Sequence, residues 1–245
     1  MIKRRSEKTT GMRLEETVRT SSGLYTVAEA ALYAKMRTAT LGRWLYGDKS
    51  HIALRGSLIS KTEGRFLTFL EFVEALAVRT LRNTHGLSLQ KIRGALEICK
   101  KEYSIDYPFA NRDHKVFLVG GDLNIVIGKN PNPVQLTGRN KRQQAFRPCL
   151  EQFMRNLVFD DKKTAMEFIA YRYPVPNEAT TINVVMNPRY CFGDPVIQGT
   201  GYRAETLWRA AVAEGSEAVA AEFYEVNVNA VIAACRYCDD MGIPA

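Results

Sequence analysis

The sequence predicts an α+β protein that is mainly helical and carries short β hairpins. Apolar residues recur at three- and four-residue steps, as in Leu41, Trp44 and Leu45, which is the spacing of one buried helix face. Between such stretches, short β-prone runs flank glycines, as at 116–119 and 123–127. The 245 residues are 46% hydrophobic and 24% charged, which is ordinary for a globular protein. This length predicts two domains, or one domain with an appendage.

Four segments are expected along the chain. Residues 1–23 are polar and predict a flexible basic arm, whereas 24–110 predict a domain with a winged helix-turn-helix. Residues 111–180 predict a central hairpin and linker region, and 181–245 predict a three-helix unit preceded by a short hairpin.

Two short helices with a tight break between them are expected near the N-terminus. Thr26 and Glu29 have the spacing of a capping box, so a helix begins there and runs to about Ala34. A second helix, capped by Thr38, is expected to end at Gly47.

The stretch after these helices predicts a wing and two longer helices. Residues 50–65 alternate and contain glycine, which is typical of a short hairpin. From Phe66 the apolar spacing becomes helical and continues to Leu81. Ser88 is expected to cap the next helix.

The central region predicts a mixture of short elements. Residues 115–127 indicate a hairpin, and the polar stretch 129–145 indicates an exposed linker. Apolar spacing predicts a short helix at 150–157, and β-prone residues predict a strand at 168–173. The prolines at 173–177 indicate a domain boundary.

The C-terminal segment predicts a strand and three helices. Residues 182–185 are strand-like, and the glycines and prolines of 188–201 indicate a tight hairpin or a bulged strand pair. Apolar spacing then predicts helices at 204–214, 216–224 and 228–241.

The excess positive charge lies at the front of the chain. Residues 1–110 carry 19 Lys and Arg against 11 Asp and Glu, a net charge of +8, whereas residues 111–245 carry 15 of each. A local positive potential attracts polyanions such as nucleic acid. An excess of this size also occurs on ordinary soluble enzymes, and a charged helix face is also consistent with simple solvation.

The remaining composition indicates a cytoplasmic protein without cofactor, metal or catalytic centre. No apolar run reaches the ~20 residues of a membrane span, and the five cysteines do not indicate a disulfide framework. Cys235 and Cys238 form a Cys-x-x-Cys inside an apolar stretch, which favours buried thiols over a zinc or redox site. The three histidines do not have metal-ligand spacing, and phosphate-binding and nucleophile motifs are absent.

The N-terminal third resembles the MerR-type DNA-binding domain. The stretch from Tyr25 to Ala31, Thr40-Leu41-Gly42-Arg43-Trp44, and the stretch from Gly86 to Arg93 carry the resemblance. It implies that the second helix enters a major groove, where Arg reads a guanine edge and Thr meets a thymine methyl. The exposed side chains would be Arg37, Thr38, Thr40, Arg43 and Tyr46. Phosphate contacts around the wing would come from Lys49, Arg55, Lys61 and Arg65. The long dimerising coiled coil typical of that family is absent from the sequence pattern.

The C-terminal segment resembles a small domain of unknown function common in prokaryotic antitoxins, of DUF 433 type. The match rests on Gly193, Pro195, the apolar pair that follows, and Gly199-Thr200, with Gly201 where that family often has Arg. The glycines themselves have a structural explanation, because they allow positive φ in tight turns. The helices that follow carry an acidic surface, which suits protein contact better than phosphate.

Taken together, the two ends of the chain resemble VapB-type antitoxins of the helix-turn-helix kind. The resemblance implies a homodimer that binds its own operator DNA, represses its operon and neutralises a PIN-domain ribonuclease toxin. Two alternatives stay open: a stand-alone DNA-binding regulator without a toxin, and a protein-interaction module in which the basic charge is incidental.

Overall fold

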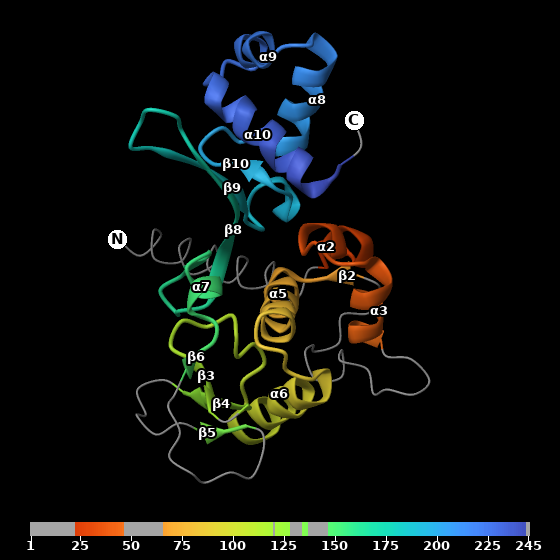
Figure 1. Ribbon diagram of the computed structural model, residues 1–245, viewed down its shortest axis with the longest axis vertical. Coiled ribbons are helices and arrows are strands. Elements are labelled where there is room, and N and C mark those ends of the chain that lie inside the picture. The colour runs from red at the N-terminus through yellow and green to blue at the C-terminus, as the bar shows by residue number, and fades with distance from the viewer. Residues whose placement is uncertain (1–22, 47–65, 120, 128–133, 137–146, 244–245) are drawn as a thin grey trace, which may run out of the picture. The chain divides into compact units, whose positions relative to one another are not determined.

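The computed structural model describes residues 23–46, 66–119, 121–127, 134–136 and 147–243 (Figure 1). The chain divides between Ala165 and Met166 into two units, each with its own packed interior. Residues 1–22 of the predicted arm (1–23) and the whole predicted wing at 50–65 lie outside the described residues.

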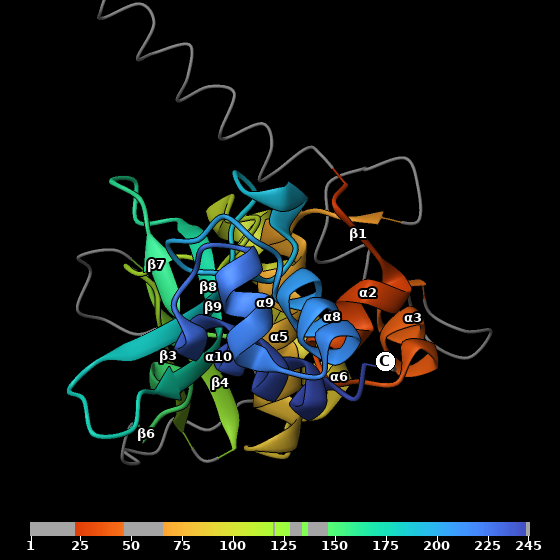
Figure 2. The ribbon, with the colours of Figure 1, turned by 90° about the horizontal axis from the view of Figure 1, so that it is seen from above.

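The first unit begins with a helix pair that a small β ladder holds in place. Strand β1 (Tyr25–Thr26) pairs antiparallel with β2 (Phe66–Leu67), and helices α2 (Val27–Tyr33) and α3 (Thr38–Tyr46) follow β1. The predicted capping box is confirmed, because the Glu29 amide donates to Thr26 Oγ1 at 3.2 Å while the Thr26 amide donates to Glu29 Oε2 at 2.8 Å. Figure 2 shows α2 and α3 side by side.

Two fifteen-residue helices form the centre of this unit. Helix α5 (Phe69–Asn83) begins three residues later than predicted, because Thr68 and Glu71 form a second capping box. Phe66 is therefore an exposed strand residue of β2, and the prediction that it starts the helix is wrong. The predicted Ser88 cap of α6 (Leu89–Tyr103) is confirmed, with the Lys91 amide donating to its hydroxyl.

The predicted central hairpin is confirmed and belongs to a four-stranded antiparallel sheet. Strands β3 (Lys115–Val119) and β4 (Asp122–Val126) are the inner pair, with β5 (Val134–Gln135) beside β4 and β6 (Arg147–Pro148) beside β3. The prediction of an exposed linker at 129–145 is wrong in its middle, because β5 pairs with β4 and Leu136 is buried.

The first unit ends in a short helix and strand. Helix α7 (Glu151–Met154) is a single turn, and the chain then extends into β7 (Leu157–Phe159). The predicted helix at 150–157 is therefore too long, since Leu157 is buried as a strand residue rather than as part of a helical stripe.

The second unit combines an antiparallel sheet with three helices that follow it in the chain. Strand β8 (Ala165–Pro174) contains the predicted strand and pairs with β9 (Thr181–Met186), which pairs with β10 (Val196–Ile197). The predicted hairpin at 188–201 supplies only β10 as a regular strand, because a 3₁₀ turn, η1 (Cys191–Gly193), occupies its first half.

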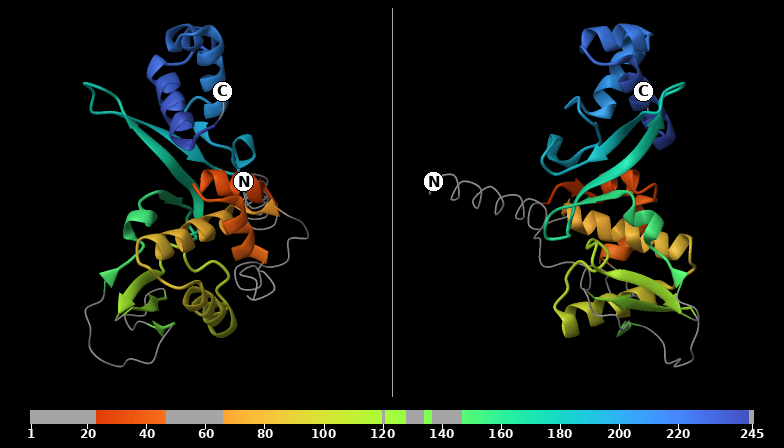
Figure 3. Two further views of the ribbon diagram at one scale, coloured as in Figure 1. Left: turned by 45° about the vertical axis from the view of Figure 1, so that its right-hand side comes forward. Right: turned by 90° about the vertical axis from the view of Figure 1, so that its left-hand side faces the viewer.

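The three C-terminal helices lie close to the predicted bounds. They are α8 (Ala204–Glu214), α9 (Glu217–Phe223) and α10 (Val228–Met241), and each contacts the other two (Figure 3). Small and branched side chains fill the space between them, including Ala211, Ala220, Ala221 and Val231.

Candidate functional site

The turn between α2 and α3 is fixed by the backbone. Lys35 takes the left-handed conformation with φ of 48°. The Lys35 amide donates to the Leu32 carbonyl and the Met36 amide donates to the Ala31 carbonyl, each at 2.8 Å. These bonds satisfy the carbonyls at the end of α2 and set the direction in which α3 leaves the turn.

The inner face of α3 is apolar and packed. Leu41 and Leu45 are each only 1% exposed, and Trp44 is also buried. The guanidinium of Arg82 on α5 lies 5.5 Å from the centroid of the Trp44 ring, which is the geometry of a cation–π contact. This packing fixes the rotation of α3 about its axis and so determines which side chains face outward.

The outward face of α3 carries the predicted base-reading residues. Arg37, Thr38, Arg43 and Tyr46 are exposed, and Thr40 is half-buried. Helix α3 begins at Thr38 itself, so this residue lies in the first turn rather than before it, and the Arg37 carbonyl accepts from the Thr40 amide at 2.9 Å. Among the described residues, the guanidinium groups of Arg37 and Arg43 have no ion-pair or hydrogen-bond partner.

Small residues lie between the larger side chains of this face. Ala39 is exposed, and a Cβ placed on Gly42 would meet no heavy atom within 4 Å. Glycine inside a helix costs about 1 kcal/mol relative to alanine. Packing against the described residues does not explain why this position is glycine rather than alanine. Ala39 and Gly42 neighbour Arg43 and Tyr46 at four-residue spacing on this helix, so another molecule can approach the face closely.

The four cations assigned to the wing lie outside the described residues. They are Lys49, Arg55, Lys61 and Arg65. Their grouping with the α3 face stays a prediction.

The surface of the second unit has the opposite charge. Residues 166–245 contain five Arg, no Lys and ten Asp or Glu, a net charge of −5. Within this unit, a cavity of about 630 Å³ is lined by the carboxylates of Glu178 and Glu225 and by the rings of Tyr202 and Tyr224. The described lining residues include no Lys or Arg, so the cavity favours a cationic guest.

The sequence motif at 199–201 forms one wall of this acidic cavity. The Thr200 hydroxyl donates to the Ile197 carbonyl at 2.9 Å and accepts from the Tyr202 amide at 3.1 Å, which closes a tight turn. The Tyr202 ring then meets the Tyr224 ring edge-on with centroids 5.0 Å apart. The motif therefore positions an aromatic side chain at the cavity.

An exposed apolar ridge adjoins the acidic cavity. Phe223 at the end of α9 is 76% exposed and contacts the Tyr224 ring at a centroid distance of 5.2 Å. Val219, one turn earlier, is also exposed. Phe223 and Tyr224 are not among the site residues predicted from the sequence. Two adjacent aromatic residues between Glu222 and Glu225 are the pattern that could have indicated this ridge.

Within the described ranges, the cysteines and the other potential ligands do not form a metal centre. No group of three His, Cys, Asp or Glu suited to a metal ion occurs within the described ranges. Burial raises the pKa of the Cys238 thiol to about 12 and that of the Cys235 thiol to about 11, which favours the unreactive thiol form. No single described helix is long and apolar enough to cross a membrane; α9 and α10 reach that composition only as a pair bent by 119°.

The chain is similar to known proteins in sequence and in fold. No family model matches the chain. It is 26% identical over 206 residues to a Mycobacterium tuberculosis (strain ATCC 25618 / H37Rv) protein named "Putative antitoxin VapB45", an alignment that spans 74% of this chain and 79% of the relative. The crystal structure of Rv2018 from Mycobacterium tuberculosis has a similar fold, with a TM-score of 0.59 and 23% identity over 88% of this chain and 98% of that one.

Proposed function

We propose that the protein is a non-enzymatic antitoxin of a toxin–antitoxin pair that also represses its own operon by binding operator DNA through α3. The observation that carries the DNA-binding part is the outward face of α3, where Arg37 and Arg43 are exposed and have no partner among the described residues. The similarity to a protein named as an antitoxin supports the toxin-binding part.

The dimensions and chemistry of α3 suit a major groove. An α-helix with its side chains is about 10–12 Å in diameter, and the groove is about 12 Å wide. Arg43 can donate two hydrogen bonds to a guanine edge, and the Thr38 methyl can contact thymine. The expected phosphate contacts of Lys49, Arg55, Lys61 and Arg65 would fix the register without reading sequence.

A homodimer would double the recognition surface. Two-fold symmetry would place two copies of α3 about 34–36 Å apart on one side of the duplex. The operator is then expected to be a palindrome with half-sites one helical turn apart.

The second unit supplies the surface for the toxin, which we propose to be a PIN-domain ribonuclease. Its acidic cavity offers Glu178 and Glu225 to an arginine or lysine of the partner, with the Tyr202 and Tyr224 rings beside the cation. The exposed Phe223 ring next to the cavity gives the interface an apolar anchor.

Binding of the full chain to DNA from upstream of its own operon tests the first part. Arg43→Ala is expected to weaken binding to that DNA by about 1–3 kcal/mol and to leave binding to unrelated DNA nearly unchanged. Arg236→Ala, which removes an exposed arginine of α10 in the second unit, is the matched control. Equal weakening on both DNAs would make Arg43 a phosphate contact, and no weakening would overturn the interface.

Co-expression with the ribonuclease encoded beside the gene tests the second part. Growth arrest by the ribonuclease should be relieved by the full chain and by Arg43→Ala. Operator binding without relief of growth arrest would favour a stand-alone regulator. Relief without operator binding would favour a protein-interaction module with incidental basic charge.

A further inference from the structure

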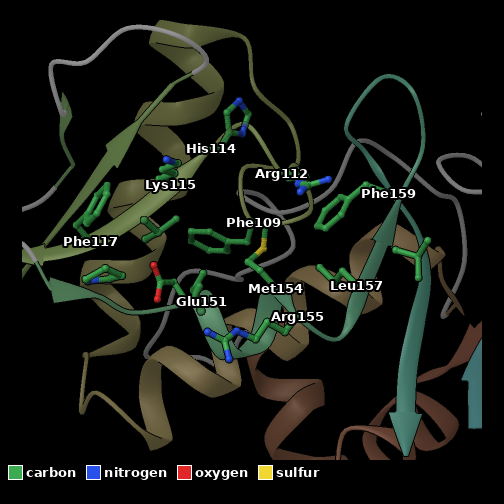
Figure 4. A pocket seen from close by; sticks show the side chains of 14 residues that line it. Phe109, Arg112, His114, Lys115, Phe117, Glu151, Met154, Arg155, Leu157 and Phe159 are labelled. Carbon is green, nitrogen blue, oxygen red and sulfur yellow. The ribbon is translucent and has the colours of Figure 1, made fainter. Parts of the chain in front are cut away.

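A second cavity, within the first unit, lies apart from the α3 face. Its volume is about 830 Å³, and its walls come from the segment 109–117, from β6 and α7, and from β7 (Figure 4). This volume lies within the range of small-molecule sites in proteins, about 300–1,000 Å³.

The interior of this cavity is apolar. Phe109 is only 1% exposed, and Val116, Leu150 and Leu157 are also buried. Figure 4 shows the Phe109 ring and the Met154 thioether together at the centre of the site. An apolar group of a ligand would therefore be removed from water here.

The rim is cationic. Arg112, Lys115 and Arg155 line the cavity together with one carboxylate, that of Glu151. Arg112 and Lys115 are exposed, and within the described part of the chain their charged groups have no partner. Burial lowers the pKa of His114, whose Nδ1 donates to the Pro108 carbonyl at 3.2 Å. This shift favours the neutral ring, so the excess positive charge belongs to the other three residues.

The floor of the cavity is held rigidly from behind. One carboxylate oxygen of the fully buried Glu74 accepts from the Phe109 amide at 2.7 Å and from the Ala110 amide at 3.0 Å. The Cys149 amide donates to the Val116 carbonyl at 3.2 Å, which ties the β6 wall to β3. These hydrogen bonds hold the cavity walls in place before any ligand binds, so binding does not have to order the walls.

We propose that this cavity binds an amphipathic organic anion, with an aromatic or aliphatic body against Phe109 and Met154 and an anionic group at the rim to which Arg112 and Lys115 contribute. Apolar contacts supply most of the affinity, and the two cations select ligands that carry a carboxylate, sulfonate or phosphate. The proposal does not depend on the DNA-binding or antitoxin roles, because it rests on the cavity alone.

Fluorescence titration of the full chain with two matched probes tests this proposal. 8-Anilinonaphthalene-1-sulfonate carries an anionic group, and N-phenyl-1-naphthylamine has the same rings without it. The sulfonate probe is expected to bind saturably and at least tenfold more tightly than the neutral probe. Equal affinity for the two probes, or unsaturable binding of the sulfonate, would overturn the proposal.

Three variants locate the probe. The double variant Arg112→Ala/Lys115→Ala should weaken binding of the sulfonate at least tenfold, whereas Arg209→Ala/Arg236→Ala in the second unit should leave it unchanged. Glu151→Gln removes the opposing rim carboxylate and should tighten binding two- to fivefold, a gain that a misfolded variant would not give. Unchanged affinity in the first and third variants would contradict the assignment.

Discussion

The two units of this chain carry opposite net charges, although in both units the helices bury apolar residues and expose charged ones. Residues 1–165 have a net charge of +13 and residues 166–245 a net charge of −5. In the first unit, the outward face of α3 presents Arg37 and Arg43. In the second, the exposed positions of α9 are Glu217, Ala218, Val219, Glu222 and Phe223.

This difference shows why charge is best counted by folded unit. A division after residue 110 makes the rest of the chain look neutral, because residues 111–165 carry +5 and cancel the −5 of the second unit. The fold separates these charges. A polyanion is expected to contact only the first unit, and a basic protein only the second.

Reversal of the two arginine charges on the α3 face should have the largest effect on DNA binding by the first unit. Arg37→Glu/Arg43→Glu is expected to weaken operator binding at least a thousandfold, about 4 kcal/mol, because two attractive contacts with DNA become repulsive. Arg209→Glu/Arg236→Glu makes the same change of net charge in the second unit. Anisotropy titrations in which both double variants lose equal affinity would show that total charge, not the α3 face, drives binding.

The two units should also differ in how pH affects their stability. The carboxylates buried among the described residues, Glu71, Glu74 and Asp122, all belong to the first unit. Burial raises the pKa of Glu74 from an ordinary 4.5 to about 8, although two amide donors act in the opposite direction. The folded protein therefore holds a proton that the unfolded chain releases, so stability is full below pH 4.5 and falls as pH rises through 8.

Denaturant unfolding of the full chain between pH 5 and 8 measures this effect. We expect the free energy of unfolding of the first unit to fall by about 3 kcal/mol over that range, on the basis of about 1.4 kcal/mol per pK unit. Glu74→Gln, which keeps an oxygen for the Phe109 and Ala110 amides, should remove most of the slope. A slope that persists in this variant would show that another group titrates.

Charge reversal in the acidic cavity should act on the toxin alone. Glu178→Lys/Glu225→Lys is expected to weaken binding of the ribonuclease about thirtyfold, measured by calorimetry, while operator affinity stays the same. Glu205→Lys/Glu214→Lys on α8 is the control, since neither residue lines the cavity. Similar losses in both double variants would indicate general electrostatic attraction rather than a cavity.

A pair of glycine substitutions gives the smallest expected effects, with opposite signs in the two units. Gly42→Ala should raise the free energy of unfolding by about 0.5–1 kcal/mol, because the position is helical and has room for a Cβ. Gly215→Ala should lower it by about 1 kcal/mol, because Gly215 ends α8 with φ of 64°. Urea unfolding distinguishes the two, and destabilisation by Gly42→Ala would contradict the open outward face of α3.

Local patterns predicted the helices well, and nonlocal features escaped them. The Thr26 and Ser88 caps and the bounds of α8 and α10 depend on residues within one or two turns, which a sequence displays directly. Thr68 and Glu71 have the same capping-box spacing. The helix was nevertheless predicted to begin at Phe66, because this apolar residue fits the three- and four-residue spacing of the residues that follow.

Strands β5 and β6 and the two cavities could not be predicted from local sequence patterns. Two-residue strands such as β6 exist only through their pairing, in this case with β3, which is distant along the chain. The acidic cavity brings Glu178, Thr200 and Tyr224 together from three separate elements. The α3 face was predictable because one continuous segment, residues 37–46, contains all of it, and its wing cations stay predictions.

Hydrogen exchange of the full chain, with and without operator DNA, tests the central claim most directly. If α3 binds the duplex, amide exchange should slow in the segment Thr38–Tyr46 and stay unchanged in α8, α9 and α10. Slowing confined to those three helices, or unchanged exchange throughout α3 at saturating DNA, would contradict the assignment of the α3 face.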